Sequence, residues 1–126
     1  MHLILDSTFL IDHMKGDQSA RAWWRRMFEL GDQPVVTEIV VCEVRTGLRD
    51  RDVGILERLL GSMEFVQPGL ETAMLAGQWR AEVRQTGRTL GPADALIAAA
   101  AFHLGGGVVT RNVRDFELTP VRIETY

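Results

Sequence analysis

Four acidic residues in this 126-residue sequence border or interrupt apolar segments, where oxygen ligands could converge in the folded chain. They are Asp6, Glu43, Asp94 and Asp115. Carboxylates that are brought together repel one another, and a hard divalent cation such as Mg²⁺ or Mn²⁺ relieves the repulsion by taking oxygen ligands. A cation site is therefore expected if the fold brings these four side chains to one place.

Asp6 and Asp94 each border an apolar segment. Asp6 ends the apolar run HLILD, where a helix cap is an equally good role. Asp94 opens the segment DALIAAAAFHL, which is apolar on nearly every side. A lone buried carboxylate must be paired, protonated or bound to a metal, so Asp94 is the sharper candidate. Its alternative role is that of a first-turn acid that favours the helix dipole.

Glu43 lies in the mostly apolar segment EIVVCEVRTGL. The residues three and four positions later are Thr46 and Gly47, so an ion pair within the helix has no cation to use. A functional role for Glu43 is therefore favoured over a surface ion pair.

The single cysteine, Cys42, has no cysteine or histidine neighbour at zinc spacing and is predicted to be a small buried residue.

The segment TRNVRDF, residues 110–116, places two arginines around two further candidate residues of the site. Asn112 and Asp115 follow the apolar run GVVT, and both residue types are also common in turns. Arg111 and Arg114 are candidate contacts to phosphate, and ordinary surface ion pairs are the alternative.

Short apolar runs alternate with helical patterns along the whole chain. Strands are expected at residues 2–6, 34–37, 64–68, 107–110 and 121–126, and helices at 7–14, 18–30, 38–48, 52–63, 71–87 and 92–104. This alternation indicates an α/β domain with a mostly parallel sheet covered on both faces. Such sheets bind ligands outside the carboxyl ends of their strands, where the strand order reverses. If the first and fourth strands are neighbours, Asp6 faces the loop after residue 110.

Composition limits the classes of protein that fit. A length of 126 residues with 46% hydrophobic residues predicts one globular domain, residues 1–126. A net charge of −3 argues against a protein that coats nucleic acid through bulk positive charge. No apolar run is long enough to span a bilayer, and a cytoplasmic protein is expected.

Trp23 and Trp24 are adjacent on a predicted helix, so one is expected in the core and the other at the surface or in a partner groove.

Three stretches resemble the PIN-domain ribonucleases, in particular the VapC toxins of prokaryotic toxin–antitoxin pairs. LILDSTFLID is similar to the first motif, with Asp6 as its acid and Thr8 as its small hydroxyl residue. VVTEIVVCEVRTGL is similar to the second, with Glu43 as its acid. GRTLGPADALIAAAAFHLGGGVVTRNVRDF is similar to the third and fourth, with Asp94 as an acid and Asn112 where many members carry an aspartate. Whether Asp115 replaces that aspartate stays open.

The resemblance implies a three-layer α/β/α fold, a homodimer, Mg²⁺-dependent cleavage of RNA with Mn²⁺ as a substitute, and inhibition by a VapB-like antitoxin. Asp6 and Asp94 would hold the metal, while Glu43 and Asp115 would position water for hydrolysis to a 5′-phosphate and a 3′-hydroxyl. Since Asn112 is neutral, one tightly held ion is expected. The alternative is a PIN-like module that binds RNA or protein without cutting, and the presence of three motif acids argues against it.

Overall fold

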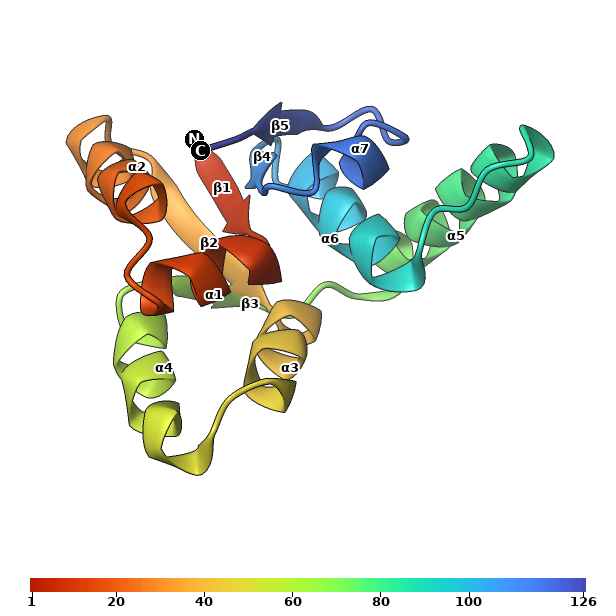
Figure 1. Ribbon diagram of the computed structural model, residues 1–126. Helices are drawn as coiled ribbons and strands as arrows, with labels where there is room; N and C mark the ends of the chain where they lie inside the picture. Colours follow the sequence, from red (N-terminus) through yellow and green to blue (C-terminus); the bar gives the residue numbers. More distant parts are fainter.

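The computed structural model describes residues 1–126 as five strands joined by helices (Figure 1). The strands are β1 (His2–Leu5), β2 (Gln33–Thr37), β3 (Glu64–Val66), β4 (Gly107–Val109) and β5 (Arg122–Glu124). The α-helices are α1 (Ser7–Met14), α2 (Gln18–Glu29), α3 (Glu38–Thr46), α4 (Val53–Leu60), α5 (Leu70–Gln85), α6 (Pro92–His103) and α7 (Val113–Phe116), and a 3₁₀ turn, η1, spans Asp50–Asp52.

The five strands form one sheet in the order β3-β2-β1-β4-β5, and every neighbouring pair is parallel. The predicted α/β fold with a mostly parallel sheet is therefore confirmed, and the sheet is in fact wholly parallel. β1 pairs with both β2 and β4, so the strand order reverses beside β1. A ligand site is expected at such a reversal, outside the carboxyl ends of β1 and β4.

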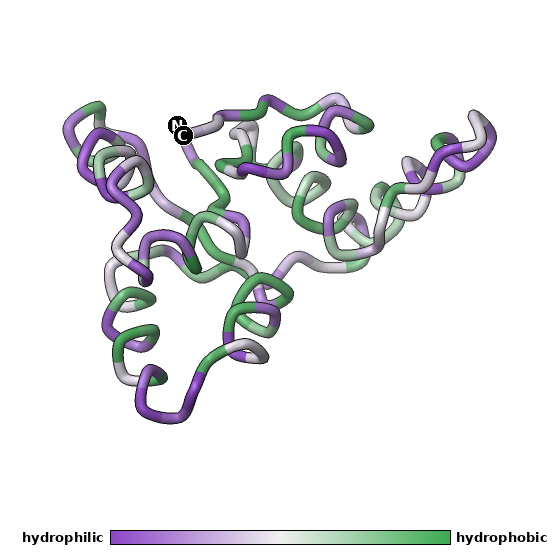
Figure 2. The backbone as a smooth tube through the Cα atoms, in the orientation of Figure 1, coloured by the Kyte–Doolittle hydropathy of each residue, from purple (hydrophilic) through white to green (hydrophobic).

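Helices cover both faces of the sheet and give the three-layer arrangement (Figure 1). In Figure 1, α1 and α2 lie on one side of β1, and α5 and α6 lie on the other. The central strand β1 is strongly apolar, and its last three residues are buried (Figure 2). α6 is buried along its alanine run, Ala98–Ala101, because small side chains let it lie close to both the sheet and α5. No helix combines the length and the hydropathy needed to cross a membrane.

Gly106 allows β4 to lie directly beside β1. The turn from α6 into β4 passes so close to β1 that a Cβ atom at Gly106 would overlap the carbonyl group of His2. Any other residue would therefore push β4 away from β1. The pairing of these two strands places the carboxyl end of β1, where Asp6 follows, next to the carboxyl end of β4.

Two packing predictions differ from the structure. Cys42 is exposed, because α3 turns Val40 and Val44 toward the core and leaves Cys42 on its outer side. Trp23 and Trp24 are both half-buried, so neither is a true core residue. The buried positions of α2 are Ala20 and Met27 instead, and the two indole rings lie at the margins of that buried stripe.

Most element boundaries also differ from the predicted ones by one to three residues, and the helix predicted at 52–63, for example, spans only Val53–Leu60. The helix predicted at 38–48 ends at Thr46, with Gly47 at its C-cap. The polar segment predicted as a loop after residue 110 contains the single helical turn α7, Val113–Phe116, which carries Asp115. A four-residue helix has too few residues to show a hydrophobic period, so the sequence pattern did not reveal it.

Candidate active site

The four acids predicted from the sequence come from four different elements and act on one another electrostatically in the structure. Asp6 follows β1, Glu43 lies on α3, Asp94 is in the first turn of α6, and Asp115 is in α7. The charges of the other three carboxylates each disfavour ionisation of Asp94. We call these four residues the acidic site, and it lies where the strand order reverses.

Asp6 is buried and is held by hydroxyl groups rather than by a helix terminus. Its side chain is 3% exposed. Its Oδ2 accepts hydrogen bonds from Thr110 Oγ1 at 2.8 Å and from Thr8 Oγ1 at 3.2 Å, and its Oδ1 accepts one from Ser7 Oγ at 3.5 Å. Asp6 occupies the N-cap position of α1, yet its side chain makes no capping hydrogen bond. The capping alternative is therefore not supported.

Thr110 is a residue of the site that the sequence interpretation missed. It is fully buried at the end of β4. Its hydroxyl donates to Asp6 and accepts a hydrogen bond from the backbone N–H of Asn112 at 2.9 Å. One side chain thus links the buried acid to the loop that carries Asn112 and Asp115. A hydroxyl residue directly after an apolar strand was the available signal, but it is also ordinary strand sequence.

Asn112 bridges Asp94 and Asp115. Its Nδ2 donates to Asp115 Oδ2 at 2.8 Å and lies 3.4 Å from Asp94 Oδ2. An amide donor between two carboxylates stabilises both, whereas an aspartate at this position would add a further negative charge. Asn112 is therefore a positioning group for the two acids.

Asp94 has the most strongly raised pKa of the four acids. Burial, followed by the charges of Asp6, Asp115 and Glu43, raises the pKa of Asp94 from 3.8 to about 6. Glu43 is more exposed, and its pKa is also raised, by burial and then by the charge of Asp6, while the hydroxyl of Ser7 opposes the shift. In both residues burial is the larger cause of the raised pKa, and the charges of neighbouring carboxylates add to it.

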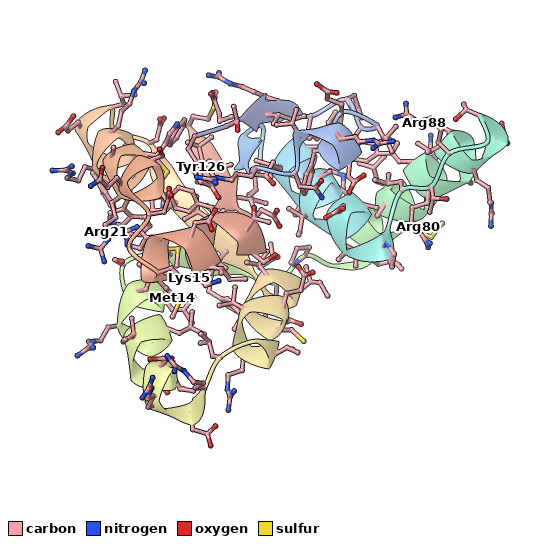
Figure 3. All side chains as sticks on the ribbon, viewed as in Figure 1. Met14, Lys15, Arg21, Arg80, Arg88 and Tyr126 are labelled. Carbon is pink, nitrogen blue, oxygen red and sulfur yellow. The ribbon has the colours of Figure 1, made fainter.

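Arg111 forms ion pairs with two aspartates of the same chain. Its Nε lies 3.3 Å from Asp12 Oδ2, its Nη2 lies 3.1 Å from Asp17 Oδ2, and its guanidinium stacks 4.8 Å from the centre of the Tyr126 ring. Tyr126, labelled in Figure 3, donates to Asp12 Oδ2 at 2.6 Å. These contacts tie the site loop to α1 and α2, and they favour the ion-pair role for Arg111. Arg114 is exposed and forms no ion pair.

The acidic site suits a cation that keeps much of its water. No three acidic, histidine or cysteine side chains stand in an arrangement that could hold one ion among them. Mg²⁺ needs fewer protein ligands, because it usually retains several waters and binds one or two carboxylates. The repulsion that raises the pKa of Asp94 is relieved by such a cation, so the donor set fits Mg²⁺ or Mn²⁺.

The raised pKa of Asp94 predicts how metal-free stability depends on pH. The folded state holds the Asp94 proton more tightly than the unfolded chain, so ionisation costs stability as pH rises from about 4 to about 6. We expect the melting temperature of the chelated protein, relative to that of Asp94→Asn, to fall through this window and then stay constant. Thermal unfolding of both proteins over a pH series measures the difference. A difference that rises with pH would contradict the raised pKa of Asp94.

Known proteins share both the sequence pattern and the fold. The PIN domain family model matches residues 3–120. Ribonuclease VapC10 of Mycobacterium tuberculosis is 32% identical over 118 residues, which cover 92% of this chain and 86% of that protein. The tRNA(fMet)-specific endonuclease VapC of Salmonella typhimurium is 36% identical over 78 residues, 61% of this chain and 59% of that protein.

Two solved structures extend the likeness over almost the whole chain. The DNA-bound VapBC structure from Salmonella typhimurium matches with a TM-score of 0.86 and 26% identity, covering 99% of this chain and 98% of that one. The VapBC2 structure from Rickettsia felis has the same fold, with a TM-score of 0.89 and 21% identity over 100% of this chain and 99% of that one. With the family model spanning nearly all of the fold and the motif acids gathered at its strand reversal, this chain belongs to the PIN domain family.

Proposed function

We propose that this protein is a metal-dependent endoribonuclease and the toxin of a VapBC-type toxin–antitoxin pair. The observation that carries the proposal is the convergence of four carboxylates outside β1 and β4, where burial and then the charges of the other three acids raise the pKa of Asp94 to about 6. Strongly perturbed acids in a crevice are candidates for catalysis. The relatives named ribonuclease VapC10 and tRNA(fMet)-specific endonuclease VapC support RNA as the substrate.

Asp6 and Asp94 are the residues proposed to hold Mg²⁺ or Mn²⁺. The bound ion would polarise a phosphoryl oxygen and lower the pKa of a coordinated water. Asp6 needs little rearrangement for this role, because three hydroxyls already fix its carboxylate. Asp94 is fixed by its place in the first turn of α6 and by the amide of Asn112.

Glu43 and Asp115 are proposed to orient the attacking water and to accept its proton. The raised pKa of Glu43 suits a proton acceptor better than an ordinary surface carboxylate would. The water oxygen forms a bond to phosphorus while the bond from phosphorus to the 3′ oxygen breaks. The 3′ oxygen takes up a proton, and the products are a 5′-phosphate end and a 3′-hydroxyl end.

The test is RNA cleavage by the purified protein before and after removal of divalent cations. We expect cleavage with Mg²⁺ or Mn²⁺, loss of cleavage on chelation, and recovery when the ion is added back. Mapping of the cut ends should find 5′-phosphates. Cleavage that survives complete chelation would contradict the metal mechanism. RNA binding with no cleavage under any of these conditions would instead favour the non-cutting PIN-like module.

A VapB-like antitoxin and a homodimer complete the proposal. The similarity to solved VapBC structures supports an antitoxin partner. Apolar surface supports self-association, since Leu70 and Met74 are 79% and 69% exposed on neighbouring turns of α5. Exposed apolar side chains that cluster in this way are typical of protein interfaces.

A further inference from the structure

Three arginines surround one small hollow beside α5. Arg80 and Arg84 lie one helical turn apart on α5, and Arg88 follows in the segment after the helix. Gly87 has a φ of 79°, and the chain reverses there so that Arg88, Thr89 and Leu90 line the same hollow. Figure 3 labels Arg80 and Arg88 in this region. We call this feature the arginine hollow.

The charges of the arginine hollow are not balanced within the chain. No acidic residue lines it, and none of its three arginines forms an ion pair. Arg80 donates its Nε hydrogen to the carbonyl oxygen of Leu90 at 2.9 Å, which leaves the two terminal nitrogens of its guanidinium free for a ligand. Like charges one turn apart on a helix repel, and a bound anion would relieve this repulsion.

The size of the hollow limits the anion. Its volume is about 120 Å³. Pockets for whole small molecules begin at about 300 Å³. The hollow has room for a phosphate group, and guanidinium groups bind phosphate through paired, charge-assisted hydrogen bonds. A nucleotide would have to lie mostly outside the hollow, as it would in an extended strand passing over the surface.

The arginine hollow lies close in the chain to the acidic site. Arg88 precedes Asp94 by six residues, which span at most about 20 Å even when fully extended. The chain from Arg88 leads directly into α6, whose first turn carries Asp94. A polyanion that approaches four carboxylates is repelled, and a nearby group of unpaired arginines supplies the attraction that the site lacks.

We infer that the arginine hollow binds a backbone phosphate of single-stranded RNA, beside the nucleotides that enter the acidic site. The inference rests on the proposed ribonuclease function. Contacts to phosphate carry no sequence information, so the hollow contributes to affinity and register rather than to the choice of sequence.

The experiment measures the salt dependence of RNA binding with Arg84→Gln/Arg88→Gln. Arg80 is kept because it holds Leu90. Binding of a short, fluorescently labelled single-stranded RNA of mixed sequence is followed by anisotropy, in chelator so that the RNA stays intact. Each lost phosphate contact should lower the slope of log Kd against log salt by about 0.7. We expect a slope lower by about 1.4 if both side chains contact phosphate.

The matched control is Arg25→Gln/Arg26→Gln, which removes the same charge from two exposed, unpaired arginines of α2, on the other side of the sheet (Figure 1). We expect this control to keep the wild-type slope. The inference is overturned if the slope of Arg84→Gln/Arg88→Gln is unchanged, or if the slope falls equally in both double variants. It is also overturned if Arg84→Gln/Arg88→Gln loses only antitoxin binding and keeps its RNA binding. A wild-type protein that binds no RNA overturns the proposed function as well, so the two failures are distinguishable.

Discussion

Asp94→Asn is expected to abolish RNA cleavage while making the metal-free protein at least as stable as the wild type at neutral pH. Asparagine keeps the shape of the side chain but removes the charge that Asp6, Asp115 and Glu43 oppose. Metal affinity falls because a neutral amide is a weaker ligand for Mg²⁺ than a carboxylate. Loss of groups that only orient metal ligands costs about 10- to 100-fold, so loss of a ligand should cost at least about 100-fold in activity.

Thermal unfolding separates this prediction from simple misfolding. Mg²⁺ should raise the melting temperature of the wild type, because a ligand that binds only the folded state stabilises it. Mg²⁺ should change the melting temperature of Asp94→Asn much less. Glu71→Gln is the matched control, since Glu71 is an acid in the first turn of α5 and takes no part in the acidic site. Full activity in Asp94→Asn would remove Asp94 from the mechanism.

Thr110→Val is expected to reduce both stability and activity, although Thr110 would touch neither RNA nor metal in the proposed mechanism. Valine has nearly the same shape but lacks the hydroxyl that donates to Asp6 and accepts from the backbone of Asn112. Both partners then lose a hydrogen bond in a buried place, which costs about 1–3 kcal/mol of unfolding free energy. Cleavage should fall by about 10- to 100-fold, because Thr110 orients a proposed metal ligand.

Two further variants distinguish positioning from general loss of packing. Thr110→Ser restores the hydroxyl and should recover most of the activity. Thr72→Val removes another buried threonine hydroxyl, which lies 2.8 Å from His103 Nδ1. This pair is not part of the acidic site. Thr72→Val should lower the melting temperature without a comparable loss of cleavage. Equal activities of Thr110→Val and Thr110→Ser would show that the hydroxyl has no positioning role.

The α/β fold with a mostly parallel sheet and the candidate acids beside its apolar segments were accessible from sequence for physical reasons. Apolar runs with helical segments between them leave a parallel sheet as the simplest way to bury both faces. Asp6 and Asp94 were recognisable because a carboxylate next to a buried segment needs an explanation. Cys42 was mispredicted because α3 is apolar on more sides than the fold buries, so composition alone did not reveal which side faces water.

The amino-acid sequence by itself determined the order of strands and helices and the acids that stand at their ends, because local periodicity and chain breaks carry that information. Only the tertiary structure decided the partners: Thr110 for Asp6, Asn112 between Asp94 and Asp115, and Arg111 for Asp12 and Asp17. Hydrogen bonds and ion pairs depend on fractions of an ångström between residues far apart in the chain, and Asp6 and Thr110 are 104 positions apart. No local pattern encodes such distances, so these contacts appear only when the sheet is assembled.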